Sequence, residues 1–379
     1  MHHAIKPYVT AGVAIVGAGL VAATPAVTPL PQVHTWPEMS LTADSSPLGD
    51  PSTPWTDVFN TASDNLNQLT RGFLVAPFVG SQQAMANLNG FMQQIQDDPS
   101  SINVVMGEIQ TQLKAALSSM TLMNADQDTV NSVIHQTMDG SLLGGHSLIF
   151  GQVPGFLPPD QAESLTPIIN FLGSPMSAVM MGAIGPSIAP WVAMMNSISD
   201  GDSFNEIMAS WLNGFLNGAT LDLDSLLPAI NGAGLLPETM TVTHMDIAFG
   251  GLLSTGGHVS ANPIDVVDAD GNTVTTVDAV GGSMFNSIGL GLSGIPILNN
   301  VTLQSDAIGP LGAWIGLSQV VGAQLGWGTG WDGKTTLPEV PVIPPGVDLG
   351  FPTLSEFDDG GSSAATDFDF SGLLDSLGF

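Results

Sequence analysis

Apolar side chains recur at helical spacing through the first half of the chain. From residue 53 to residue 73 a large apolar side chain comes every three or four positions, and Thr53-Pro54 offers a cap followed by proline at the first helical position. The same spacing predicts further helices over residues 81–95, 102–120, 126–138, 160–172 and 203–217. Asp126 is the expected start of the helix at 126–138, and Gly140 would close it as a left-handed C-terminal residue.

Residues 175–199 form an apolar run without a single charged side chain. A membrane-spanning helix is one interpretation of this run. The other is a buried helical hairpin broken at Gly185-Pro186. We favour the hairpin, because Pro186 and Pro190 divide the run into pieces of about 10–14 residues, which are too short to cross a bilayer.

After residue 237 the pattern changes to that of β-strands. Residues 239–249 are β-branched and partly alternating, and residues 264–280 predict a hairpin around Asp270-Gly271, a pair that tolerates positive φ. Glycine-rich apolar segments follow at 281–298 and 307–328. The expected fold class is therefore α+β, with a helical domain over residues 55–235 followed by a β- and glycine-rich domain over 238–330.

Both ends of the chain differ from this body. Residues 1–26 combine a lysine, an apolar stretch and small residues before a proline, which is the pattern of a secretory signal peptide cleaved near Ala23 or Ala26. A retained membrane helix is the alternative. Residues 27–54 predict a proline-rich connector, and residues 335–379 predict a disordered acidic tail.

Charge excludes several classes of function. The 379-residue chain has 4 Lys and Arg against 34 Asp and Glu, a net charge of −30, so we expect no nucleic-acid partner. A glycine-rich loop with a phosphate-binding lysine is absent from the sequence, so no nucleotide is expected either. With no cysteine, the chain offers no disulfide, thiol nucleophile or thiolate metal site.

Candidate chemistry is sparse. Asp265, Asp268 and Asp270, with Asn272, resemble part of a calcium loop, but Val266 and Val277 stand where that loop requires carboxylates, so a solvated hairpin turn is favoured.

The histidines give no stronger site. His146-Ser147 lies in an incomplete nucleophile-elbow pattern, because Ile149 replaces the second glycine. His244 and His258 could meet across a hairpin, although isolated histidines are more often hydrogen-bonded bystanders. No catalytic residue and no cofactor is predicted.

Several stretches together nevertheless have a family likeness. They are Tyr8–Ala14, Leu30–Val33, Leu41–Ala43, Phe215–Asp224, Ile230–Gly234 and Phe249–Leu253. On these motifs, the chain resembles mycobacterial exported proteins of the outer-membrane porin family typified by the Gordonia porin GjpA. The resemblance implies an envelope protein that passes small hydrophilic solutes through the mycolate outer membrane.

The residues themselves modify that expectation. The first half of the chain is predicted to be helical and aromatic side chains are only 6% of the total, so a pore would have to be oligomeric, helical or built from residues 239–328. Its acid excess predicts a preference for cations. The alternative is a secreted or cell-wall-associated, non-enzymatic protein that binds lipid or a protein partner. Envelope lipid or membrane, and a homo-oligomer, are the partners to be expected.

Overall fold

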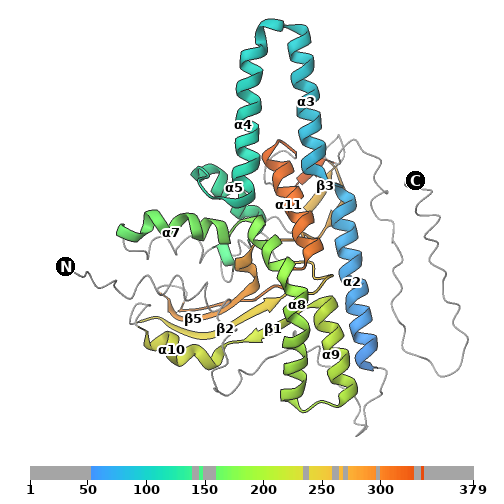
Figure 1. Cartoon of the computed structure of the whole chain (residues 1–379), viewed down its shortest axis with the longest axis vertical. Helices are drawn as coiled ribbons and strands as arrows, with labels where there is room; N and C mark the ends of the chain where they lie inside the picture. Colours follow the sequence, from blue (N-terminus) through green and yellow to red (C-terminus); the bar gives the residue numbers. More distant parts are fainter. Residues whose placement is uncertain are drawn as a thin grey trace, which may run out of the picture.

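The computed structural model describes residues 53–138, 145–147, 159–233, 239–257, 264–267, 272–295, 299–327 and 334–336. Most of this described part is helical, with a small sheet beside the helices (Figure 1). The α-helices are α2 (Thr53–Val75), α3 (Val79–Asp97), α4 (Ile102–Thr121), α5 (Gln127–Thr137), α7 (Pro159–Leu172), α8 (Pro175–Asp200), α9 (Phe204–Asn217), α10 (Leu227–Gly232) and α11 (Pro310–Gln324). Short 3₁₀ turns are η1 (Pro99–Ser101), η2 (Asp224–Leu226) and η3 (Met284–Ser287).

Two sheets are present among the described residues. The strands are β1 (Ala219–Asp222), β2 (Thr241–Phe249), β3 (Ile264–Val267), β4 (Thr273–Val277), β5 (Ile288–Ile295), β6 (Asn299–Leu303) and β7 (Lys334–Thr336). The larger sheet is antiparallel with the order β1-β2-β5-β6. In the smaller one, β3 pairs antiparallel with β4 and parallel with β7. The mixture of helices with an antiparallel sheet confirms the α+β class.

The helices predicted from spacing lie where they were expected, within a few residues at their ends. The helix α5 illustrates the cause, because the Asp126 side chain accepts a hydrogen bond from the backbone N–H of Thr129 and so caps its first turn. It ends at Thr137, and Gly140, the expected closing residue, lies outside the described residues. The predicted hairpin is present as β3 and β4, although its turn also lies outside them.

The run at 175–199 is one continuous helix, α8, so the predicted break at Gly185-Pro186 is wrong. Ser174 caps this helix, and Pro186 and Pro190 both lie inside it. Each proline removes one helical hydrogen bond. Packing against α9, α11 and β1 along the length of α8 outweighs this loss.

α8 is at the centre of the packing. The sheet lies against it through β1 and β2, while α9 packs on it from another side and α2 packs on α9 (Figure 1). Met181, Ala189 and Val192 of α8 share a buried apolar cluster with Ala219 of β1 and Phe249 of β2.

Residues from the two expected domains interleave in this packing. Strand β1, which lies within 55–235, forms an edge of the sheet beside β2. The glycine-rich segment at 307–328 folds as the helix α11 and packs against α3, α4 and α8. In both cases, a segment from one expected domain packs against segments from the other.

The helices α3 and α4 extend beyond the rest of the molecule as a helical hairpin (Figure 1). We call residues 79–121, which comprise α3, η1 and α4, the arm. α11 packs at its base, where the Ser318 hydroxyl accepts a hydrogen bond from the N–H of Gly80 and the Leu325 carbonyl accepts one from the Asn87 side chain.

Other expectations fall on residues that the structure does not describe. These are the signal peptide at 1–26, the connector as far as residue 52, and the tail beyond residue 336. Thr335 and Thr336, at the start of the expected tail, belong to strand β7.

Candidate functional site

An irregularity in strand β2 determines which face of the sheet carries a group of ionisable side chains. The register between β2 and β5 shifts between Val242 and His244, which is a β-bulge. Val242 and Met245 are both buried with Leu292, although they are three residues apart. The bulge therefore turns His244 and Asp246 together to the opposite face of the sheet.

Glycines in the neighbouring strand leave room for these two side chains. His244 lies opposite Gly291 and Asp246 lies opposite Gly289, whereas Leu290 and Leu292 point into the core. A Cβ atom on Gly289 would lie only 2.3 Å from Oδ1 of Asp246. Because glycine and leucine alternate in β5, the face of this strand next to His244 and Asp246 carries no side chains at these two positions.

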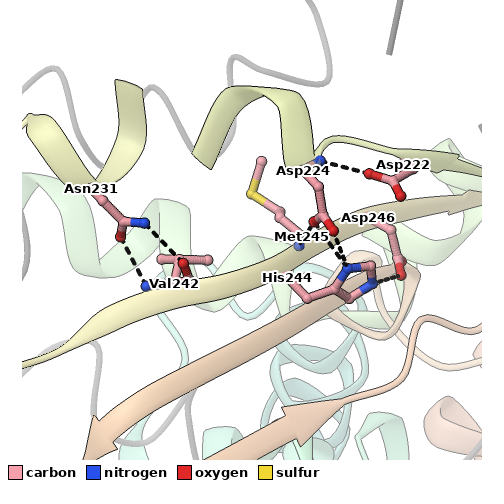
Figure 2. Close-up of polar contacts among 7 residues, drawn as sticks. All are labelled: Asp222, Asp224, Asn231, Val242, His244, Met245 and Asp246. Atoms are coloured by element: carbon pink, nitrogen blue, oxygen red, sulfur yellow. Dashed lines mark hydrogen bonds and ion pairs between the residues drawn. The ribbon is translucent and has the colours of Figure 1, made fainter. Parts of the chain in front are cut away.

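His244 lies between two carboxylates (Figure 2). Its Nδ1 lies 2.9 Å from Oδ1 of Asp224, and its Nε2 lies 2.7 Å from Oδ2 of Asp246. Asp222 adds a third carboxylate, since it pairs with Asp246 across β1 and β2. We call Asp222, Asp224, His244 and Asp246 the acidic cluster.

Backbone hydrogen bonds hold this cluster in place. Oδ1 of Asp224 accepts a hydrogen bond from the N–H of Met245 at 2.8 Å, and Oδ1 of Asp222 accepts one from the N–H of Asp224 at 2.6 Å. Nearby, Asn231 of α10 bonds both the N–H and the carbonyl of Val242, each at 2.9 Å (Figure 2). The end of β1 and helix α10 are thereby fastened to β2 at its bulge.

The charge state of His244 follows from these contacts. Partial burial disfavours the charged imidazolium, but the hydrogen bonds and attraction from Asp224 and Asp246 outweigh it and raise the pKa of His244 above its ordinary value of 6.5. When protonated, the ring donates from both nitrogens and bridges two carboxylates. It then offsets one of the three negative charges gathered at the cluster.

A cation could use part of this cluster. Ligand atoms of Asp222, Asp224 and His244 lie within 4.8 Å of one another. However, Nδ1 of His244 already contacts Asp224, and one oxygen of each aspartate already accepts a backbone N–H. A divalent ion would have to displace a proton from His244 and compete with these bonds. The donor set therefore fits a metal centre less well than it fits a clasp, by which we mean a set of hydrogen bonds that links β1 to β2.

The same geometry bears on catalysis. A general base needs a ring nitrogen that can accept a proton from a substrate. In His244 both ring nitrogens face carboxylates. The cluster therefore suits a pH-dependent clasp between β1 and β2.

The residues singled out from the sequence lie elsewhere. Asp265 lies in β3, in register with Thr276 of β4 and Lys334 of β7, whereas Asp268 and Asp270 lie outside the described residues, as does His258. His146 is buried, and its Nε2 lies 2.8 Å from the carbonyl oxygen of Ile288. That contact supports a packing role for His146.

Sequence reasoning missed the acidic cluster. From the sequence, Asp222 and Asp224 stand out only as part of the stretch that carries the family likeness, and His244 only as a possible partner for His258. A usable signal was present, since His244 and Asp246 stand two residues apart in a predicted strand and so share one face.

A second surface feature lies on α8. Met180, Ile184, Trp191 and Ile198 are between 47% and 60% exposed, and their spacing of four and seven residues places them on one side of the helix. We call them the α8 face. It is about 27 Å long at 1.5 Å per residue, and the only charged residue in α8 is Asp200, its last.

Comparison of the chain with models of protein families, with curated proteins and with solved structures found no match.

Proposed function

We propose that this protein is an exported, non-enzymatic protein of the cell envelope that binds apolar envelope lipid through the α8 face. The observation that carries the proposal is the row of Met180, Ile184, Trp191 and Ile198 on one exposed side of a helix. Contiguous apolar surface on a protein exterior is typical of a site for lipid or protein contact.

The net charge of the protein limits the kind of lipid that the α8 face can bind. The chain carries a net charge of −30, so anionic headgroups would repel it. Asp200 lies at the very end of α8, which leaves the α8 face free of charge along its length. Trp191, the most exposed of the four at 60%, is a side chain that suits the boundary between headgroups and acyl chains. The expected ligand is thus a surface of lipids without net charge.

Binding of the α8 face along a membrane surface is favoured over the crossing of the membrane by α8. Of the described helices, α8 is the one whose length and composition would suit a membrane span, and 44% of its most apolar window is buried. Its remaining sides pack against α9, α11 and β1. Crossing would require α8 to leave these neighbours, whereas contact through the α8 face requires no rearrangement.

The test is flotation of the purified protein with phosphatidylcholine vesicles on a density gradient. The wild-type protein should float with the vesicles, and Trp191→Glu should reduce the vesicle-bound fraction about tenfold, since it removes an apolar anchor and adds a charge. Val104→Glu, at a side chain that is 59% exposed on the arm, is the matched control and should bind as the wild type does. Wild-type protein that stays at the bottom of the gradient would refute the proposal.

A role of porin type is the second candidate, and one observation favours it. The 26-residue α8 is long enough to cross a bilayer, so several copies could in principle supply the walls of a helical pore. The acid excess predicts that such a pore prefers cations. Planar-bilayer recordings of detergent-purified protein test this candidate, and anion-selective steps, or none at all, would rule it out.

A further inference from the structure

The arm exposes large apolar side chains on both of its helices. Besides Ile102 and Val104 of α4, they include Met85, Leu88 and Met92 on α3 and Met106, Leu113 and Leu117 on α4, each of these six between 45% and 59% exposed. We call these six residues the apolar side of the arm. Their exposure is unusual for a helical hairpin, in which residues at such spacing are normally buried between helices.

Contacts within the arm show which positions face inward. The Asn87 side chain donates a hydrogen bond to Oε1 of Gln112 at 2.9 Å, so these two residues face each other across the hairpin. Val105 is completely buried. Leu88, Met106 and Leu113 each follow one of these inward-facing residues directly.

Because of this one-residue offset, the apolar residues of α3 and those of α4 face the same side of the hairpin. One residue is a rotation of about 100° in a right-handed helix. α3 and α4 run in opposite directions (Figure 1). Because the two helices face each other, as the bond between Asn87 and Gln112 shows, their inward faces also point in opposite directions. The same rotation therefore turns the apolar residues of both helices to one common side. Val104, which precedes Val105, lies on the other side and is 59% exposed.

Charge is scarce on the arm. It carries Asp97, Asp98, Glu108 and Lys114, a net charge of −2 in a chain of −30. The first two lie at the tip, on either side of the end of α3. Two copies of this acidic protein would thus repel each other least where their arms meet.

We propose that the apolar side of the arm binds the same side of the arm in a second copy of this chain, so that the two hairpins form a four-helix bundle. A two-fold axis makes one surface its own complement, which is the commonest arrangement in homodimers. Helices of similar length with apolar residues every three or four positions pack well in such bundles. The uncharged Gln and Asn side chains of both helices would form the rim.

The small size of this surface indicates a weak dimer. From residue 85 to the tip, the arm is about 20 Å long and two helix diameters, or roughly 20 Å, wide. Two such surfaces bury on the order of 800 Å², which is below the size of a standard stable interface. The dimer should therefore be weak, with dissociation in the micromolar range, and its population should depend on protein concentration.

Lipid is a poorer occupant of the same surface. Insertion of the arm would bring the carboxylates of Asp97 and Asp98 into the bilayer first, and the amide side chains of α3 would follow. Each of these groups loses hydrogen bonds to water in a hydrocarbon environment. At the rim of a protein interface, these carboxylates and amides can keep their hydrogen bonds.

Sedimentation velocity of the full-length exported protein in lipid-free buffer, over a range from about 1 to 200 µM, tests the proposal. The wild-type protein and Val104→Glu should shift from monomer to dimer as concentration rises. Met106→Glu should remain monomeric at every concentration, because the two-fold axis gives each interface two added carboxylates. Circular dichroism should show the same helix content in all three proteins.

A second measurement uses the absence of cysteine from the chain. With a short bis-maleimide reagent, Met106→Cys should give a covalent dimer, and Val104→Cys should give at least fivefold less. A wild-type protein that remains monomeric at 200 µM, or a Met106→Glu variant that dimerises like the wild type, would overturn the proposal. Trp191→Glu should still dimerise, so the result is independent of lipid binding through the α8 face.

Discussion

The crossing of α8 and α9 gives a sharp prediction, because Gly214 of α9 lies against the backbone of α8. A Cβ atom at this position would lie 2.5 Å from the carbonyl oxygen of Ala189 and 2.8 Å from Cα of Pro190. Ordinary contacts begin near 3.4 Å, so Gly214→Ala requires the helices to separate by about 1 Å. Overpacking of this kind costs about 1–3 kcal/mol, and the better helix propensity of alanine returns up to ~1 kcal/mol.

The expected net loss is about 1–2 kcal/mol, which lowers the melting temperature by about 2–8 °C for a domain of this size. Thermal unfolding followed by far-UV circular dichroism measures the change. Gly107→Ala is the matched control, because a Cβ atom there meets no atom within 4 Å in the exposed middle of α4. It should raise the melting temperature by about 1–4 °C through helix propensity alone. Equal shifts of the same sign in both variants would refute the packing argument.

Two further predictions concern the acidic cluster, and a third concerns a buried hydrogen bond between helices. His244→Gln should be least stable relative to the wild type below pH 6.5, and the difference in unfolding free energy should shrink as pH rises through the raised pKa of His244, as urea titrations at several pH values would show. A difference that grows with pH would contradict the clasp. Gly289→Ala should push Asp246 away and lower the pKa of His244 toward 6.5, as measured by NMR titration of the imidazole protons. Thr137→Val should cost about 1–2 kcal/mol in denaturant unfolding, since it removes the buried hydrogen bond, 2.8 Å long, to the carbonyl of Gly173.

The helices could be predicted because their signals are local. Apolar spacing and caps such as Asp126 act within a few residues of one another, and the structure retains them. The break at Gly185-Pro186 was wrong for the opposite reason. Proline weakens a helix locally, whereas α8 continues because distant segments, α9 and α11 among them, pack along it.

The acidic cluster could not be assembled from the sequence by the same means. It requires a bulge that places His244 and Asp246 on the face opposite Val242, and two glycines in another strand that leave space for them. The bulge is a property of the pairing between β2 and β5, and the partner residues follow from register. Asp224 joins only because β1 and β2 are neighbours in the sheet.

The arm also fixes how far its tip lies from the charge of the body. The Asn87 side chain of α3 donates a hydrogen bond to the Leu325 carbonyl at the end of α11, and the tip begins near Asp97, about 15 Å farther along α3. At physiological ionic strength the Debye length is about 8 Å, so the tip is about two Debye lengths from the acidic body, and the field there is reduced to roughly a seventh. Encounters at the tip should therefore respond less to salt than encounters at the body. The repulsion that an anionic surface meets at the tip comes mainly from Asp97 and Asp98 and not from the charge of the body.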